Sequence, residues 1–109
     1  MGRFKRLTAD EINALLGLQP GWQLSADKLS ITTAITFTSF QEAWKFMTTV
    51  AEAAEQLNHH PNWSNAYNNV SIRLTTHDAN SLTERDLRLA KCIADALQEF
   101  DYSRASSHE

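Results

Sequence analysis

The sequence predicts a two-layer α+β domain in which helices cover one face of a four-stranded antiparallel sheet. Three observations predict this fold: capping signals ahead of three segments with helical spacing, paired segments of alternating polarity between them, and a length of 109 residues that suits one core. The expected order is helix, two strands, long helix, two strands, helix. Strands in neighbouring pairs with helices between them favour antiparallel pairing.

The first three elements follow from the residues near the N-terminus. Thr8-Ala9-Asp10-Glu11 has the form of a capping box, and the helix that it begins is expected to end near Gly17. Pro20-Gly21 marks a turn. Residues 22–24 and 29–37 then alternate between apolar and mostly polar side chains, which predicts a hairpin.

The long central helix is expected to begin at a second capping box, Ser39-Phe40-Gln41-Glu42. Apolar residues recur at helical spacing as far as Leu57, and they include Trp44, which we expect in the core. Pro61 lacks an amide proton and disfavours a helical His60, so the helix should end before them. Residues 58–60 are therefore expected at the exit from the helix.

The last three elements are two strands and a helix. Residues 63–67 predict a short strand, Asn68-Asn69 a turn, and Val70, Ile72 and Leu74 the buried side of a longer strand. Its opposite face is expected to hold Ser71, Arg73, Thr75 and His77. The segment Thr83-Glu84-Arg85-Asp86 caps the last helix, where Asp86 favours the helix dipole and can complete the cap.

We expect one domain over residues 1–109, with disordered tails at 1–6 and 103–109. With 42% hydrophobic and 21% charged residues, the composition is that of a soluble globular protein. The net charge of −3 supplies no positive field for phosphates, which disfavours direct nucleic-acid binding. Cys92 is the only cysteine, and no signal-peptide or membrane-spanning pattern is present, so the expected location is cytoplasmic.

Three histidines are the candidates for chemistry. His59, His60 and His77 each fall where an element ends, among polar residues, and imidazoles with an ordinary pKa of about 6.5 can both give and take protons near neutrality. Glu55 lies one helical turn before His59 and could orient it. Taken singly, each histidine also fits a solvated element end, and Asp86 fits a helix cap.

A metal site is the rival interpretation, because three histidines and a carboxylate are familiar zinc ligands. The adjacent residues His59 and His60 should point in different directions, and the His-Glu-x-x-His spacing is absent. Cys92 lies at helical spacing among apolar residues, where a thiol is unreactive. We therefore expect neither a metal nor a nucleophilic cysteine.

Four segments of the chain resemble the pterin-4a-carbinolamine dehydratases. They are Glu55-Gln56-Leu57-Asn58-His59-His60-Pro61-Asn62-Trp63, Tyr67-Asn68, Leu74-Thr75-Thr76-His77-Asp78 and Leu82-Thr83-Glu84-Arg85-Asp86. The resemblance runs from about Leu7 through the last helix. It implies a hydro-lyase that dehydrates 4a-hydroxytetrahydropterin to quinonoid dihydropterin, the tetrahydrobiopterin-recycling step after an aromatic amino-acid hydroxylase, without cofactor or metal.

The resemblance also implies the residues of the site. His59 and His77 would transfer protons, His60 would position the pterin, and Glu55 would support the histidines. Further substrate-binding positions are implied by similarity at Asn58, Trp63, Thr75, Thr76, Asp78 and Asp86. Trp63 and Tyr67 are aromatic residues that could wall a pocket, although packing is the ordinary role of such residues and the expected one for Tyr67. At Asn62 an acidic residue would be expected.

The partners implied are the pterin, an aromatic amino-acid hydroxylase and a second copy of the chain. An open antiparallel sheet has edge strands that need cover, which favours a homo-oligomer, a dimer or a tetramer. The animal family member also stabilises dimers of a homeodomain transcription factor. The alternative function is therefore a non-catalytic interaction module on the same fold, binding a transcription factor or a hydroxylase.

Overall fold

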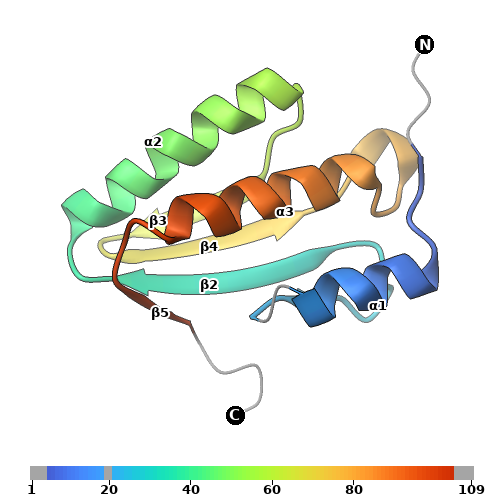
Figure 1. Cartoon of the computed structure of the whole chain (residues 1–109), viewed down its shortest axis with the longest axis horizontal. Coiled ribbons are helices and arrows are strands. Elements are labelled where there is room, and N and C mark those ends of the chain that lie inside the picture. The colour runs from blue at the N-terminus through green and yellow to red at the C-terminus, as the bar shows by residue number, and fades with distance from the viewer. Residues whose placement is uncertain (1–4, 19–20, 105–109) are drawn as a thin grey trace.

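The computed structural model describes residues 5–18 and 21–104 (Figure 1). The helices and strands follow one another along the chain as α1 (Ala9–Leu18), β1 (Gln23–Leu24), β2 (Ile31–Phe37), α2 (Phe40–Leu57), β3 (Asn62–Ala66), β4 (Asn69–Leu74), the short 3-10 helix η1 (His77–Ala79), α3 (Glu84–Leu97) and β5 (Tyr102–Arg104). The predicted α+β class is confirmed, and the seven predicted elements occur in the predicted order, with η1 added before α3 and β5 after it. Within the described residues, no helix is both long enough and apolar enough to span a membrane.

The sheet has the strand order β1-β2-β4-β3, and β5 also pairs with β2. All of these pairings are antiparallel. Helices α2 and α3 contact each other and lie over the same face of the sheet (Figure 1). On the other face, β4 turns its alternate side chains Asn69, Ser71 and Arg73 to the outside. The strands therefore have one face buried and one exposed.

The predicted tails are wrong at their inner ends, and the sheet has five strands instead of four. Ser103 and Arg104 pair with Thr36 and Ile35 as part of β5. Arg6 forms a bridge with Thr83. Such short pairings carry no alternating pattern of their own, because the backbone of a partner strand determines them. Residues 1–4 and 105–109 lie outside the described residues.

Three helices begin at the predicted capping residues. In α1 the Thr8 amide donates to Glu11 at 2.8 Å and the Glu11 amide donates to the Thr8 hydroxyl at 3.1 Å. This hydrogen bond from the Thr8 backbone is the main reason that the pKa of Glu11 is lowered. Ser39 accepts from the Glu42 amide ahead of α2, and Thr83 with Asp86 forms a complete capping box on α3.

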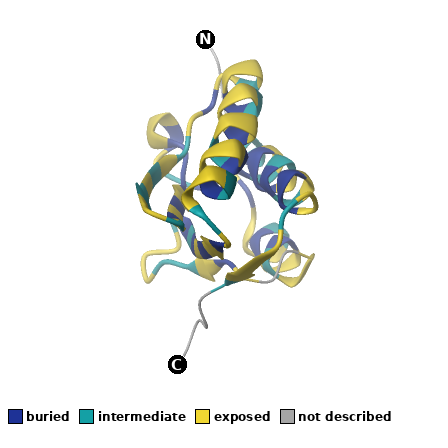
Figure 2. Cartoon of the chain, turned by 90° about the vertical axis from the view of Figure 1, so that its left-hand side faces the viewer, coloured by how far each residue is buried: buried dark blue, intermediate teal, exposed yellow. Residues whose placement is uncertain are grey.

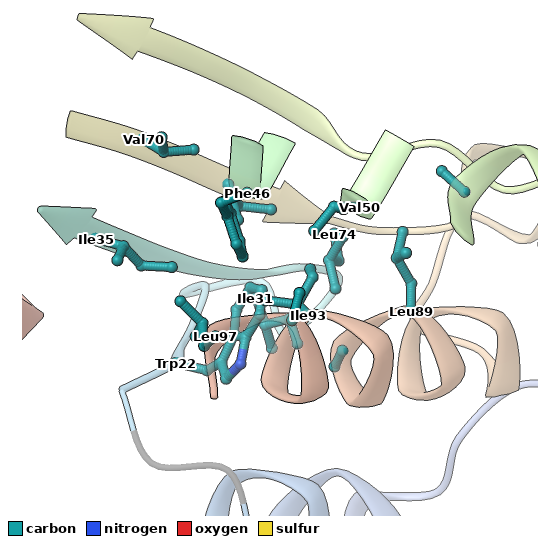
Figure 3. Close-up of a cluster of buried hydrophobic side chains, with 14 of the residues drawn as sticks. Trp22, Ile31, Ile35, Phe46, Val50, Val70, Leu74, Leu89, Ile93 and Leu97 are labelled. Atoms are coloured by element: carbon teal, nitrogen blue, oxygen red, sulfur yellow. The ribbon is translucent and has the colours of Figure 1, made fainter. Parts of the chain in front are cut away.

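The core lies between the sheet and the helices α2 and α3 (Figure 3). Figure 2 shows the buried side of each helix turned inward and the exposed side outward. Large side chains that are less than 2% exposed come from both layers: Ile31, Ile35, Phe46, Val50, Val70, Ile72, Leu74, Leu89, Ile93 and Leu97 among them. Each contributes about 1.5–3 kcal/mol relative to an exposed position.

The prediction that Trp44 lies in the core is wrong. Trp44 is 57% exposed and stacks on Phe40, which is 44% exposed, with ring centroids 6.1 Å apart. The side of α2 that packs on the sheet instead carries Ala43, Phe46, Val50 and Ala54. Both sides of this helix carry apolar residues at helical spacing, so spacing alone does not identify the buried one.

The hairpin between β3 and β4 turns one residue earlier than predicted. Tyr67 and Asn68 form the turn, and Tyr67 has a positive φ of 56° and is 68% exposed. The Asn65 side chain stabilises this turn by donating to the carbonyls of Tyr67 and Asn69 at 2.9 and 3.0 Å. The packing role expected for Tyr67 is therefore wrong. Beyond the hairpin, β4 ends at Leu74, so the exposed face expected to continue through Thr75 and His77 does not extend that far. Thr75 is buried, and His77 belongs to η1.

Candidate active site

Helix α2 ends as predicted, just before Pro61, and the cause is visible in its last turn. Asn58 caps the helix in the left-handed region with φ 52°, a conformation that asparagine tolerates better than most residues. The amide of Asn58 donates to the Glu55 carbonyl at 3.1 Å, and that of His59 to the Ala54 carbonyl at 3.0 Å. The chain thus reverses at Asn58 and sends the two following histidines in different directions.

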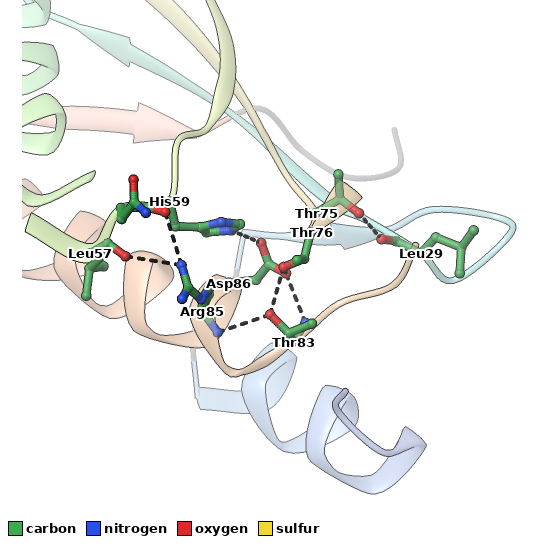
Figure 4. A network of polar contacts seen from close by, with 9 residues as sticks. Leu29, Leu57, His59, Thr75, Thr76, Thr83, Arg85 and Asp86 are labelled. Carbon is green, nitrogen blue, oxygen red and sulfur yellow. Dashed lines mark hydrogen bonds and ion pairs between the residues drawn. The ribbon is translucent and has the colours of Figure 1, made fainter. Parts of the chain in front are cut away.

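His59 turns into the protein and contacts Asp86, the third residue of α3. Its Nε2 lies 2.6 Å from Oδ1 of Asp86, and the two side chains are 10% and 0% exposed (Figure 4). The other carboxylate oxygen, Oδ2, accepts from the Thr76 hydroxyl at 2.8 Å and from the Thr83 amide at 2.9 Å. The Thr76 and Thr83 hydroxyls are 2.7 Å apart. This buried network fixes the His59 ring and joins the end of α2 to the start of α3.

His60 turns outward and contacts Glu55. Its Nε2 lies 2.6 Å from Oε2 of Glu55, and these side chains are 56% and 76% exposed. The expectation that Glu55 would orient His59 is therefore wrong. The spacing of four residues places two side chains together only while the helix continues, and here it ends at Leu57.

Arg85 was not singled out by the sequence as a site residue. Its Nη1 donates to the carbonyl oxygen of Asn58 at 3.1 Å and to that of Leu57 at 3.4 Å (Figure 4). Those carbonyls belong to the C-terminal end of α2, where a cation is favourable. A signal was present in the sequence: an arginine in the first turn of α3 opposes that helix's own dipole, so it needs another partner.

The three histidines meet at one pocket of about 320 Å³, which we call the histidine pocket. Seven of the ten predicted site residues line it: Asn58, His59, His60, Thr75, Thr76, His77 and Asp78. Pro61, Asn62 and Arg85 line it as well.

The other three predicted residues do not line the histidine pocket. Asp86 contacts His59, and Glu55 contacts His60. Trp63 packs against the core and lines a different hollow on the sheet. The direct substrate contacts expected of Trp63 and Asp86 are thus not supported by the geometry, whereas Glu55 contacts a histidine as the resemblance implies.

The polar groups of the pocket differ in how far they are already engaged. The Thr75 hydroxyl donates to the Leu29 carbonyl at 2.6 Å, and Thr76 is held by Asp86. His77 is exposed and has no side-chain hydrogen bond to any residue in 5–18 or 21–104. Across the same residues, no group of three His, Cys, Asp or Glu side chains is placed to hold a metal ion. The pocket therefore offers imidazoles that can exchange protons with a small polar ligand.

Comparisons with known proteins point to one family. The family model described as pterin 4 alpha carbinolamine dehydratase matches residues 5–96. A Rhizobium rhizogenes protein provisionally named pterin-4-alpha-carbinolamine dehydratase is 46% identical over 86% of this chain and 93% of its own. A Sinorhizobium fredii protein with the same provisional name is 50% identical over 81% and 84%. A Brucella melitensis crystal structure titled transcriptional coactivator/pterin dehydratase is 40% identical, with a TM-score of 0.80 over 84% of this chain and 98% of its own.

Proposed function

Because the chain belongs to the pterin 4 alpha carbinolamine dehydratase family, we propose that it dehydrates 4a-hydroxytetrahydropterin to quinonoid dihydropterin. This is the 4a-hydroxytetrahydrobiopterin dehydratase reaction, catalysed by a hydro-lyase. One observation supports the proposal above the others: His59, His60 and His77, from two separate segments, line a single small pocket.

The reaction asks for two proton transfers and no change of oxidation state. The C4a hydroxyl accepts a proton and leaves as water, while the N5–H proton passes to a base and the N5 electron pair forms the N5=C4a double bond. Imidazoles suit both transfers near neutral pH. The residues of the histidine pocket supply these groups without any added cofactor.

His59 and His77 are the proposed proton-transfer groups. With Nε2 bonded to Asp86, His59 keeps Nδ1 as the nitrogen for the substrate, and Asp86 stabilises the imidazolium when that nitrogen takes a proton. His77 has both nitrogens free of other described residues, so it can approach the leaving hydroxyl. His60 would position the pterin from the exposed side of the pocket, and Glu55 would hold the His60 ring.

The test generates the carbinolamine with a pterin-dependent aromatic amino-acid hydroxylase and follows its loss by absorbance. The protein should speed this loss over buffer. His59→Ala and His77→Ala should each lower kcat, on the order of 100-fold, as expected when one acid–base group is removed. His60→Ala should raise KM more than it lowers kcat, because its proposed role is positioning.

Trp44→Ala serves as the folded control, since Trp44 is exposed on α2 and does not line the histidine pocket. Circular dichroism should show that each variant keeps its fold. No acceleration by the unaltered protein, together with no effect of His59→Ala and His77→Ala, would refute the enzymatic function.

The second candidate is a non-catalytic interaction module that binds a transcription factor or a hydroxylase. Two observations favour it: the similar Brucella melitensis protein is named a transcriptional coactivator as well as a pterin dehydratase, and the rings of Phe40 and Trp44 are exposed and stacked on α2. Loss of partner binding in Trp44→Ala, with no dehydration by any form of the protein, is the result that this candidate predicts.

The proposal includes association of the chain with itself. Within residues 5–18 and 21–104, strand β3 pairs only with β4 and forms one edge of the sheet, where unpaired backbone groups favour a further strand. Light scattering at working concentration would give the mass of a dimer or tetramer if this holds, and the mass of one chain if it does not.

A further inference from the structure

A second hollow of about 520 Å³ lies on the outer face of the sheet, and we call it the sheet hollow. Asn62 lines both this hollow and the histidine pocket, so the two adjoin at the start of β3. The two hollows also adjoin along the chain at the end of β4. Arg73 lines the sheet hollow, and Thr75, two residues later, lines the histidine pocket. A ligand held by the histidines can therefore extend onto the sheet.

The strand register places a cation at this junction. Arg73 on β4 stands opposite Asn62 on β3 and opposite Thr32 on β2, so the three residues form one row across the outer face. Directly opposed side chains in an antiparallel sheet have Cβ atoms about 5 Å apart. Arg73 is exposed. Its neighbour on β3, Asn62, also lines the histidine pocket.

The charge of Arg73 stands out in its surroundings. Of the described residues that line the sheet hollow, Arg73 alone is charged, in a chain whose net charge is −3. The ion pairs in residues 5–18 and 21–104 do not include it. The pKa of the nearby Asp27 is lowered first by the Ser25 hydroxyl, then by the Leu29 amide, and less by Arg73. Asp27 is thus held mainly by its own turn.

The histidine pocket is small, so a larger ligand would gain from a second binding space beside it. Pockets for small molecules span about 300–1,000 Å³, and about 320 Å³ lies at the lower end of this range. The bicyclic pterin ring is a fitting occupant, and a long substituent on that ring would need space beside the pocket. The sheet hollow is larger than the histidine pocket, and Asn62 lines both.

We propose that the sheet hollow binds an anionic group carried on the side chain of a pterin whose ring occupies the histidine pocket. Arg73 supplies the cation, in a fork geometry that matches phosphate and carboxylate oxygens. The hydroxyls of Thr32 and Ser71 line the same hollow and can donate to the anion. This inference rests on the proposed function for the ring and adds a preference for acidic pterins.

The experiment compares ligands that differ in charge. Binding of 7,8-dihydroneopterin, its 3′-monophosphate and 7,8-dihydrofolate is measured by isothermal titration calorimetry. At least one acidic ligand should bind about tenfold more tightly than neutral dihydroneopterin, the scale of one charge-assisted contact. The phosphate and the carboxylate arms show which anion is used. In Arg73→Gln that ratio should fall close to one, and Arg73→Lys should retain part of it.

Arg88→Gln is the matched control, because Arg88 is an exposed arginine on α3 that lines neither hollow. It should keep the full preference. Failure of all three ligands to bind would overturn the proposed function as well. Binding of neutral dihydroneopterin without any preference for the acidic ligands would overturn only the proposal for the sheet hollow. A preference that survives in Arg73→Gln would do the same.

Discussion

Two neighbouring histidines show how the same contact differs between the inside and the surface. His59 lies 2.6 Å from Asp86 and His60 lies 2.6 Å from Glu55, so distance does not distinguish the pairs. Burial does: the first pair is 10% and 0% exposed, the second 56% and 76%. Water and salt screen the exposed pair, whereas the buried one has lost its water and depends on its protein partners.

The carboxylates of Asp86 and Glu55 therefore have separate roles. Asp86 caps α3, accepts from Thr76 and fixes the His59 ring at the same time, so it is part of the fold as much as of the site. The Glu55 side chain, by contrast, has His60 as its one hydrogen-bond partner among the described residues. A rigid and an adjustable histidine can thus come from consecutive residues when a left-handed residue, Asn58, precedes them.

Removing Asp86 should have the largest effect. Asp86→Ala leaves His59, the Thr76 hydroxyl and the Thr83 amide without their buried acceptor, and we expect a loss of about 3–5 kcal/mol in the free energy of unfolding. Urea unfolding followed by circular dichroism measures it. Asp86→Asn keeps the shape and one acceptor oxygen, so it should lose less. A loss below about 1 kcal/mol for Asp86→Ala would mean that the network is not stabilising.

Removing Arg85 should have an intermediate effect, because it acts on the turn that both histidines share. Arg85→Ala loses the bonds to the Leu57 and Asn58 carbonyls, and these partly exposed contacts should be worth about 1–2 kcal/mol. Amide hydrogen exchange should then quicken at His59, whose amide closes the end of α2. Arg85→Lys keeps the charge and should restore part of the protection. Unchanged exchange in Arg85→Ala would show that the turn holds without it.

The sequence predicts well those parts of the fold that local chemistry determines. Capping residues place the starts of α1, α2 and α3, and the alternation of Val70, Ile72 and Leu74 gives the buried side of β4. Pro61 predicts that α2 ends ahead of it, and the helix ends at Leu57. In each case the signal lies within a few residues of the feature. The three histidines of the pocket are predicted because they lie where elements end, whereas Asn58, Thr75, Thr76 and Asp78 are implied by the family resemblance.

Contacts between distant segments could not be predicted in this way. His59 and Asp86 are 27 residues apart and meet only because the end of α2 packs beside the start of α3. No local spacing encodes that approach, so Glu55 was paired with the wrong histidine. Strand β5 and the exposed position of Trp44 were missed for a related reason. Strand β5 forms because β2 offers a backbone to pair with. On α2, apolar residues lie on two sides of the helix, and spacing does not show that the side with Ala43 and Ala54 is the buried one.

Removing the charge of Glu55 should have the smallest effect on stability. Glu55→Gln should change the free energy of unfolding by less than about 1 kcal/mol, because both side chains are mostly exposed. At about 1 M sodium chloride, where the screening length is about 3 Å, even this difference should vanish, while the cost of Asp86→Ala remains. Urea unfolding of the two variants at low and high salt makes the comparison directly. Equal costs for Glu55→Gln and Asp86→Ala at high salt would contradict it, since burial would then not separate the two pairs.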